Sequence, residues 1–261
     1  MKILECGNLS KHFGGLAAVN HVNLEIHGGE IVGLIGPNGA GKTTLFNLIT
    51  GFLPPSSGKI SFDGLDITDL PPYAIAKRGL VRTFQKITLF PALSVLENVS
   101  IGSYLHIKGG FLKSLVQSRT KQIEKKLSLV EGDRILQFVG LSKWKKQKAG
   151  NLPLGGLQRI LGIAIALAAQ PKLLLLDEPA SGMNTEEKKN IIDIIRKISR
   201  SGITIFIVEH DMNVVMNVCQ RVIVLDYGEV IAEGSPEIIQ RDPKVVEVYL
   251  GKGYKHDTGV S

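Results

Sequence analysis

Nine consecutive residues near the N-terminus constrain this chain more than any other feature: Gly36-Pro37-Asn38-Gly39-Ala40-Gly41-Lys42-Thr43-Thr44. They follow the pattern G-x-x-x-x-G-K-T, which is typical of loops that hold the phosphates of a nucleotide. The apolar run at residues 31–35 predicts a buried strand before the loop, and residues 43–50 predict a helix after it. Strand, loop and helix in this order are the local context that phosphate binding requires.

The residue types in this loop suit a polyanion. Glycines let consecutive backbone N–H groups approach the phosphates, because no Cβ blocks the way. The start of the following helix adds the positive end of its dipole. We expect Lys42 to reach the β- and γ-phosphates and the Thr43 hydroxyl to hold Mg²⁺. The loop therefore predicts that a nucleotide is bound, but not what its energy is used for.

Asp177 and Glu178 form the second chemical signal, because they follow four consecutive leucines. Such a run predicts a strand buried on both faces, as in a parallel sheet. An acid at the carboxyl end of a parallel strand faces the ligand crevice. Asp177 is thus placed to hold Mg²⁺ through water, and Glu178 to orient and polarise an attacking water. The alternative is that the pair caps the next helix.

Three further residues are weaker candidates. His210 follows a buried strand, and it either contacts the γ-phosphate or serves as a polar cap. Gln85 follows an extended run and carries little information by itself. Phe13 is the lone aromatic residue of the turn predicted at residues 11–15, where it either fills the core or stacks on a nucleobase.

The length and composition limit the classes to which the protein can belong. The chain of 261 residues is long enough for one large α/β domain with two lobes. It has only two cysteines, Cys6 and Cys219, so a disulfide framework is not expected and a reducing cytoplasm fits. The N-terminus shows no signal-peptide pattern, and the most apolar stretch, residues 160–169, is too short to span a bilayer. A role at a membrane must therefore come through partners.

The net charge of +7 is concentrated in one segment. Its basic residues are Lys108, Lys113, Arg119, Lys121, Lys125, Lys126, Arg134, Lys143, Lys145, Lys146 and Lys148. A solvated helical face is the simplest interpretation. A surface near anionic lipid headgroups is a second, and nucleic acid is a third. The absence of interleaved aromatic residues counts mildly against single-stranded nucleic acid.

Periodicity along the chain predicts a P-loop NTPase core of α/β class, opened by an antiparallel β part and interrupted by a helical subdomain. Strands are expected at 3–9, 19–26, 31–35, 59–64, 172–177, 203–208, 221–226 and 229–233, and helices at 43–50, 185–199, 211–219 and 243–250. Strand signals vanish over 94–170, where helical spacing appears and Gly109-Gly110 marks a break. We expect one domain over 1–250, with a core lobe at about 1–93 and 171–250, a helical lobe at about 94–170, and a tail at 251–261.

The set of motifs resembles a known family. Residues 36–44, Gln85, residues 173–178 and His210 stand in the order of the P-loop, Q-loop, Walker B and H-loop of ABC-transporter ATPase subunits, over residues 3–250. Finer stretches look like the ATP-binding subunit of branched-chain amino acid importers. These are Arg82-Thr83-Phe84-Gln85, residues 89–98, Asp177-Glu178-Pro179-Ala180-Ser181-Gly182-Met183-Asn184 and Glu209-His210-Asp211-Met212. The long helical insert around residues 103–130 is similar to that of the larger of the two ATPases in such importers.

The resemblance implies an ATPase that uses ATP and Mg²⁺ and works in a dimer. Each ATP is held by one subunit's P-loop and capped by the signature motif of the other, which is a homologous ATPase or an identical copy. Closure of the dimer is transmitted to two membrane permeases, and indirectly to a substrate-binding protein, at the cytoplasmic face of the membrane. Gln85 would sense the γ-phosphate and Mg²⁺, His210 would contact the γ-phosphate, and Phe13 would pack on adenine.

The signature loop departs from the family's L-S-G-G-Q. The chain reads Asn151-Leu152-Pro153-Leu154-Gly155-Gly156-Leu157-Gln158-Arg159 before the helix expected at 160–169. When the two glycines of the motif are aligned with Gly155 and Gly156, Leu154 takes the serine position and Leu157 the glutamine position. This alignment is ambiguous by one residue. Backbone N–H groups at the helix start can still bind a γ-phosphate. Losing one hydrogen bond to a charged group costs roughly 1.5–3 kcal/mol, so we expect the composite site capped by this loop to be the weaker one.

Two other functions remain open at this stage. An ATPase that drives lipid or lipopolysaccharide export has similar single-domain subunits, although Gly182-Met183-Asn184 and the insert favour the importer. A soluble ABC-type ATPase acting on nucleic acid or ribosomes is a different class. Proteins of that class usually carry two such domains or a long coiled coil, whereas this chain has one P-loop and no sustained heptads.

Overall fold

The structure, a computed structural model, describes the backbone of residues 1–84, 88–103, 118–153 and 155–250, and the side chains of these ranges except 118–125 and 250. The chain forms two compact units, one of residues 1–71 with the chain from 204 onwards, the other of residues 72–203. The predicted core and helical lobes divide the chain elsewhere and stay a prediction. The predicted break at Gly109-Gly110 and the tail at 251–261 lie outside the described residues.

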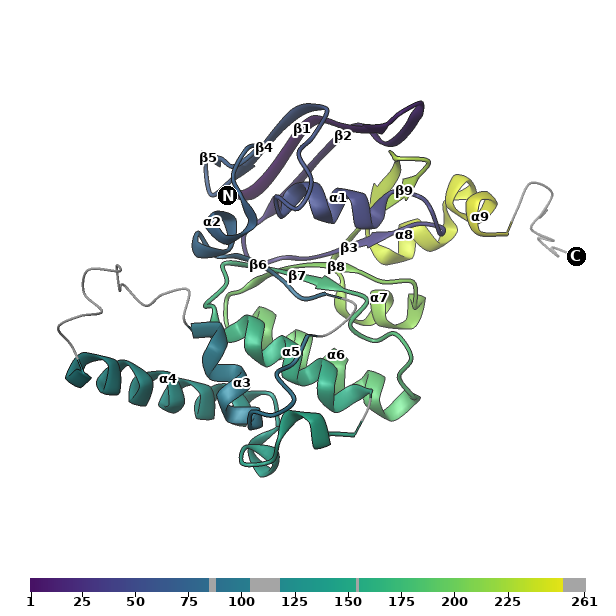
Figure 1. The fold of residues 1–261 in the computed structure, drawn as a ribbon. Helices are drawn as coiled ribbons and strands as arrows, with labels where there is room; N and C mark the ends of the chain where they lie inside the picture. The colour runs from purple at the N-terminus through teal and green to yellow at the C-terminus, as the bar shows by residue number, and fades with distance from the viewer. Residues whose placement is uncertain (85–87, 104–117, 154, 251–261) are drawn as a thin grey trace, which may run out of the picture. The chain divides into compact units, whose positions relative to one another are not determined.

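An antiparallel sheet opens the first unit (Figure 1). Its strands are β1 (Lys2–Phe13), β2 (Leu16–His27), β4 (Ser57–Phe62) and β5 (Leu65–Asp66), in the order β2-β1-β4-β5. The turn predicted at residues 11–15 is wrong for 11–13, which continue β1 and pair with β2. Only Gly14 and Gly15 turn the chain, because the pairing with β2 continues to Phe13, which lies opposite Leu16.

Parallel strands form the buried centre of the first unit. They are β3 (Ile31–Ile35), β8 (Thr204–Val208) and β9 (Arg221–Asp226), and β3 pairs in parallel with both of the others. Every residue of β3 and β8 is buried, as expected for the middle of a parallel sheet. Strand β10 (Glu229–Gly234) adds an antiparallel edge beside β9, which confirms the predicted hairpin.

Four helices belong to the first unit: α1 (Lys42–Ile49), α7 (Met212–Val218), α8 (Pro236–Arg241) and α9 (Pro243–Leu250). The sequence analysis missed α8. Its signal was present, because Ser235 precedes Pro236, and proline is favoured in the first turn of a helix. Helices α1, α7 and α9 lie within one or two residues of their predicted bounds.

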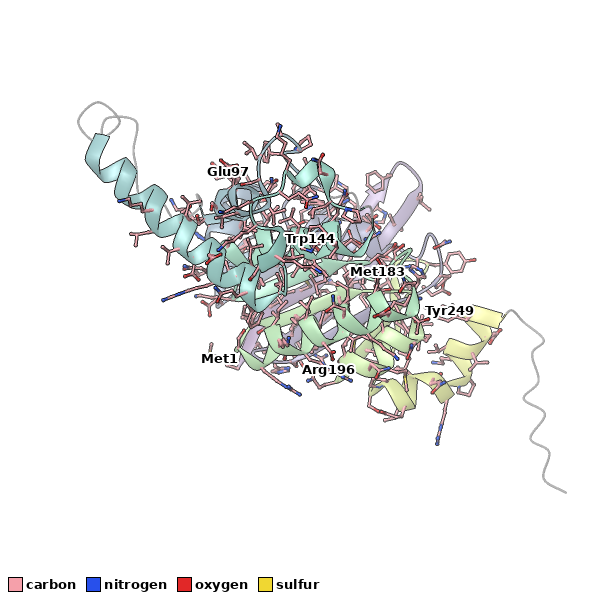
Figure 2. The ribbon with its side chains drawn as sticks, turned by 90° about the horizontal axis from the view of Figure 1, so that it is seen from below. Met1, Glu97, Trp144, Met183, Arg196 and Tyr249 are labelled. Carbon is pink, nitrogen blue, oxygen red and sulfur yellow. The ribbon has the colours of Figure 1, made fainter. Side chains whose placement is uncertain are left out.

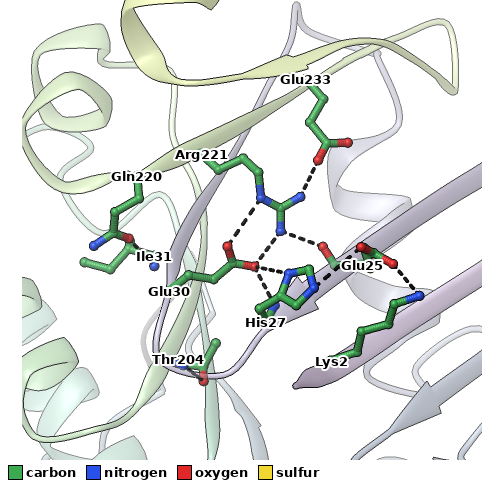
Figure 3. A network of polar contacts seen from close by, with 10 residues as sticks. Lys2, Glu25, His27, Glu30, Ile31, Thr204, Gln220, Arg221 and Glu233 are labelled. Carbon is green, nitrogen blue, oxygen red and sulfur yellow. Dashed lines mark hydrogen bonds and ion pairs between the residues drawn. The ribbon is translucent and has the colours of Figure 1, made fainter.

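A network of charged residues fastens the segments of this unit that are most distant in sequence (Figure 3). The guanidinium of Arg221 binds Glu30 at 2.5 Å and also contacts Glu233. Its Nη2 donates to the backbone oxygen of Glu25 at 2.7 Å, and the side chain of Glu25 pairs with Lys2 at 2.6 Å. The start of β9 is thereby tied to β2, β10 and the first residues of the chain.

The second unit is mainly helical (Figure 1). Its helices are α2 (Pro72–Lys77), α3 (Val95–Gly102), α4 (Ser118–Phe138), α5 (Gly156–Ala168) and α6 (Thr185–Arg200). Strands β6 (Leu80–Arg82) and β7 (Leu173–Asp177) pair in parallel, and all five residues of β7 are buried. Within the described part of residues 94–170, the long regular elements are the helices α3, α4 and α5, as predicted. Among the described helices, none is both long and apolar enough to span a bilayer.

Two helices of this unit begin with a reciprocal cap. Ser94 and Glu97 form the capping box of α3, and Asn184 and Glu187 form that of α6. Figure 2 shows Glu97 at the start of α3 and Met183 in the loop that leads into α6. Sequence signals of this type are local, and the start of α6 lies at residue 185, as predicted.

Candidate functional site

The P-loop adopts the expected strand–loop–helix arrangement within the first unit. Strand β3 ends at Ile35, and α1 begins at Lys42, one residue earlier than predicted. Gly36 lies against β9, because a Cβ there would be only 2.0 Å from the carbonyl oxygen of Leu225. The loop is therefore packed so closely on its neighbouring strand that a side chain is excluded at its first position.

The start of α1 is electrostatically open to an anion. Its first turn carries no acidic residue, and Gly41 at the N-cap offers no side chain to the backbone N–H groups. The ammonium group of Lys42 donates to the carbonyl oxygens of Gly36 (2.7 Å) and Pro37 (2.8 Å). A positive charge and the helix dipole thus converge on the loop, as phosphate binding requires.

A cavity of about 720 Å³ lies beside the P-loop, which is within the usual range for ligand sites. Pro37, Asn38 and Gly39 of the loop form one wall. Helix α9 contributes Lys244 and Glu247 to the lining. Sequence analysis missed this contribution of the C-terminal helix, because nothing local to residues 243–250 resembles a nucleotide motif.

Tyr249 of α9 (Figure 2) was also missed. Its hydroxyl contacts the backbone of Gly36 and so ties α9 to the P-loop. Burial raises the pKa of its hydroxyl above the ordinary value, and a hydrogen bond with the backbone of Gly36 offsets part of that rise. The contact joins residues more than 200 positions apart, so only the folded chain reveals it.

Phe13 and His210 are both exposed in the first unit. The Phe13 side chain is 48% exposed at the end of β1, so its alternative role as a core residue is wrong. His210 follows β8, and its alternative role as a helix cap is wrong, because the side chain of Asp211 caps α7. Glu209 is buried and accepts the backbone N–H of His210 at 3.2 Å, which fixes the turn after β8.

Asp177 ends β7 in the second unit, where it forms a buried ion pair. Its Oδ2 atom lies 2.7 Å from Nη2 of Arg82, and the two side chains are only 9% and 4% exposed. Arg82 is the last residue of β6, the parallel neighbour of β7. The strand pairing therefore places a cation directly against the acid that the sequence assigns to Mg²⁺.

Glu178 is half-buried and has an unusual backbone conformation, with φ of 47°. A left-handed backbone is uncommon for a residue with a side chain and clusters at functional sites. Its carbonyl oxygen accepts a hydrogen bond from Nη1 of Arg159 on α5 at 2.9 Å. The alternative role of this acidic pair as a helix cap is wrong, because Asn184 caps α6.

The signature loop leads into α5 four residues earlier than predicted, at Gly156. Gly156 belongs to the helix because it lies four residues before Ile160 on the buried face. The Gly156 N–H donates to Oε1 of Glu187 on α6 at 3.2 Å, so a carboxylate from another helix occupies the start of α5. Leu154 and Gln85 lie outside the described residues.

Comparison with known proteins places these features in a family. A model described as "ABC transporter" matches residues 19–181, and one described as "Branched-chain amino acid ATP-binding cassette transporter" matches residues 229–255. The high-affinity branched-chain amino acid transport ATP-binding protein BraF of Pseudomonas aeruginosa is 39% identical over 96% of this chain and 98% of its own. The chain belongs to the ABC transporter ATP-binding proteins of the branched-chain amino acid type.

Solved structures agree with this family. The crystal structure of a nucleotide-free ATP-binding cassette from an ABC transporter matches with a TM-score of 0.83 and 36% identity, covering 97% of this chain and all of the other. A cassette in its ADP conformation matches equally well, with a TM-score of 0.83 and 34% identity over 97% and 100% of the chains. The predicted α/β cassette fold is confirmed, and this ABC protein is a nucleotide-binding ATPase.

The residues predicted to hold Mg²⁺ suit that ion. Thr43 offers a hydroxyl and Asp177 a carboxylate, and hard divalent cations prefer oxygen donors. Within the described residues, no group of three or more His, Cys, Asp or Glu side chains could hold a metal. Mg²⁺ usually keeps several waters and takes substrate phosphate oxygens instead of a complete protein cage.

Proposed function

We propose that this chain is the ATP-hydrolysing subunit of an importer for branched-chain or related amino acids. It works with a second ATPase subunit and two permeases, peripherally at the cytoplasmic face of the membrane. The names of its relatives support this substrate class, as does the match of the C-terminal family model over β10, α8 and α9. The observation that carries the proposal is the open, cationic start of α1 in a chain whose β7 ends at Asp177 and is followed by Glu178.

The P-loop residues of this site bind and orient ATP. The N–H groups of residues 36–44 and the Lys42 ammonium hold its phosphates, Phe13 stacks on the adenine, and Thr43 and Asp177 hold Mg²⁺. Bound Mg²⁺ neutralises charge that develops on the phosphates. Gln85 and His210 contact the γ-phosphate side of the site.

Glu178 acts as the general base. Its carboxylate takes a proton from the water that attacks the γ-phosphorus, and the bond from that phosphorus to the bridging oxygen breaks to give ADP and phosphate. The left-handed backbone at Glu178 and the bond from Arg159 support this role, because they fix where the side chain leaves the main chain. The start of α5 at Gly155 and Gly156 caps the ATP held by the second subunit.

Replacing the general base tests this function. Glu178→Gln keeps the size and hydrogen-bonding shape of the side chain but cannot accept the proton. We expect ATP binding within about twofold of wild type, and hydrolysis reduced about 100-fold or more, the usual contribution of a general base. Glu186→Gln is the matched control, because this exposed glutamate lies on α6 outside the proposed site. Near-normal turnover by Glu178→Gln would remove Glu178 from this role.

Reconstitution tests the transport assignment. The chain is co-expressed with its membrane partners and purified with them in proteoliposomes loaded with ATP. We expect leucine, isoleucine or valine, delivered by a binding protein, to stimulate hydrolysis and to enter the vesicles. Stimulation by lipid instead, or recovery of the chain only in RNA-sensitive complexes, would favour one of the two other functions.

A further inference from the structure

The ion pair between Arg82 and Asp177 has no part in the mechanism above. Its atoms are 2.7 Å apart, and both side chains are almost completely buried. Taking a carboxylate out of water is unfavourable unless a partner compensates its charge. Arg82 supplies that compensation inside the protein.

Several contacts hold Arg82 in this position. The backbone N–H of Thr83 donates to the Leu175 oxygen at 2.9 Å, which extends the pairing of β6 with β7. The ring of Phe84 lies 5.0 Å from the guanidinium carbon, which is the geometry of a cation–π contact. These contacts fix Arg82 inside the protein, so its guanidinium group stays next to Asp177.

A second cation lines the same cavity as this acid. Arg82, Arg159 and Asp177 all line one cavity of about 240 Å³ in the second unit. Two guanidinium groups and one carboxylate give this wall a formal charge of +1. An isolated divalent cation is repelled by such a wall, whereas a cation that arrives with a polyphosphate is not.

We propose that Arg82 is the resident counter-ion of Asp177. It holds the carboxylate in place when no metal is bound, and it makes the uptake of Mg²⁺ depend on the nucleotide. This inference rests on the proposed function, because it takes Asp177 as the acid that faces Mg²⁺. Arg82 is a positioning residue, since it acts on the metal through Asp177.

Thermal unfolding of the full chain without nucleotide tests the proposal. Arg82→Met keeps the length of the side chain and removes its charge. We expect this variant to melt roughly 10 °C below wild type in EDTA, because one partner of a buried ion pair is left alone. We expect MgCl₂ to restore much of that loss, while the wild-type melting temperature without nucleotide does not respond to MgCl₂.

Three further variants separate charge balance from packing. Arg82→Met with Asp177→Asn removes both charges, so its melting temperature should not respond to MgCl₂. Arg82→Lys retains a cation and should behave like wild type. Arg134→Met, at a side chain that is 75% exposed, controls for the loss of an arginine. A MgCl₂ response in nucleotide-free wild type, or no response in Arg82→Met, overturns the proposal.

A second measurement covers the case in which Arg82→Met does not fold. Wild-type protein is titrated with MgCl₂, with and without ATP, and its melting temperature is followed. Our proposal requires a response only when ATP is present. Failure of the proposed function would appear differently, as wild-type protein that does not hydrolyse ATP whatever its melting behaviour.

Discussion

Two helices of this protein, α1 and α5, begin after glycines, and they differ in the charged side chain that lies beside their first turn. Helix α1 follows the P-loop, has no acidic residue in its first turn and has Lys42 folded over its loop. Helix α5 follows Gly155, likewise lacks an acid in its own first turn, but receives the carboxylate of Glu187 from α6. One helix start is open to a ligand, and the other is already partly satisfied by the protein.

The difference teaches that a glycine-rich helix start is not sufficient to define an anion site. What matters is the charge of the side chains that lie beside the N–H groups of the first turn. At α1 this charge is a cation from the helix itself. At α5 it is an anion, and the nearby cation, Arg159, is engaged with the Glu178 carbonyl oxygen. If the start of α5 caps ATP as we propose, it has to exchange the Glu187 carboxylate for a phosphate.

Adding one methyl group at each loop should give the largest contrast. In Gly36→Ala the new Cβ lies 2.0 Å from the Leu225 carbonyl oxygen, and this overlap can be relieved only if the backbone of the loop or of β9 shifts. We expect a loss of about 3 kcal/mol or more in unfolding free energy from such overpacking. In Gly155→Ala the nearest atom is 3.6 Å away, so only the backbone strain at φ 103° remains, about 1–2 kcal/mol. Urea unfolding measures both, and equal losses would contradict the comparison.

Removing the cation beside each loop should give the next largest effect. Lys42→Ala deletes a charged donor to the phosphates, worth about 1.5–3 kcal/mol, so nucleotide affinity should fall roughly 10- to 100-fold. Arg159→Met should leave the affinity of the isolated chain for nucleotide within about twofold, because Arg159 is bonded to the protein backbone. A fluorescent ATP analogue measures both constants. A similar loss in both variants would show that the two helix starts act alike.

Neutralising Glu187 should give the smallest effect and the opposite sign. Glu187→Gln keeps one acceptor oxygen, which can accept from the N–H of Gly156 or of Asn184 but not from both, and it removes the competing charge. A charge near a helix start is worth about 0.3–1 kcal/mol, so ATP-driven association of two subunits should tighten about two- to fivefold. Glu186→Gln controls for the loss of one negative charge on α6. Glu97→Gln controls for the replacement of a capping-box glutamate, because Glu97 caps α3. Sedimentation in ATP measures the association, and unchanged values in Glu187→Gln would show that its charge does not compete.

Much of the nucleotide site was readable from sequence because its signals are local. The P-loop, the buried strand before Asp177 and the capped helix starts each depend on residues a few positions apart. The cassette fold followed from these motifs and is confirmed by comparison. The assignment of roles to individual residues stays a prediction.

The parts that sequence did not reveal depend on long-range contacts. Tyr249 reaches Gly36, Arg82 reaches Asp177 and Glu187 reaches Gly156 only after distant elements pack together. The start of α5 was predicted too late because glycines usually end helices, whereas Gly156 begins one. The start of α5 at Gly156 depends on the burial of this residue, and burial is a property of the whole fold.

The discontinuity of the first unit has a consequence for synthesis on the ribosome. Strand β3 carries the P-loop, yet both of its sheet neighbours, β8 and β9, lie beyond residue 203. At usual translation rates of 5–20 residues per second, its apolar edges wait roughly 10–40 s for these partners to be synthesised. The second unit is continuous in sequence and is complete earlier. A nascent chain of this protein therefore completes the unit that carries Asp177 and Glu178 before the strand that leads into the P-loop has its sheet partners.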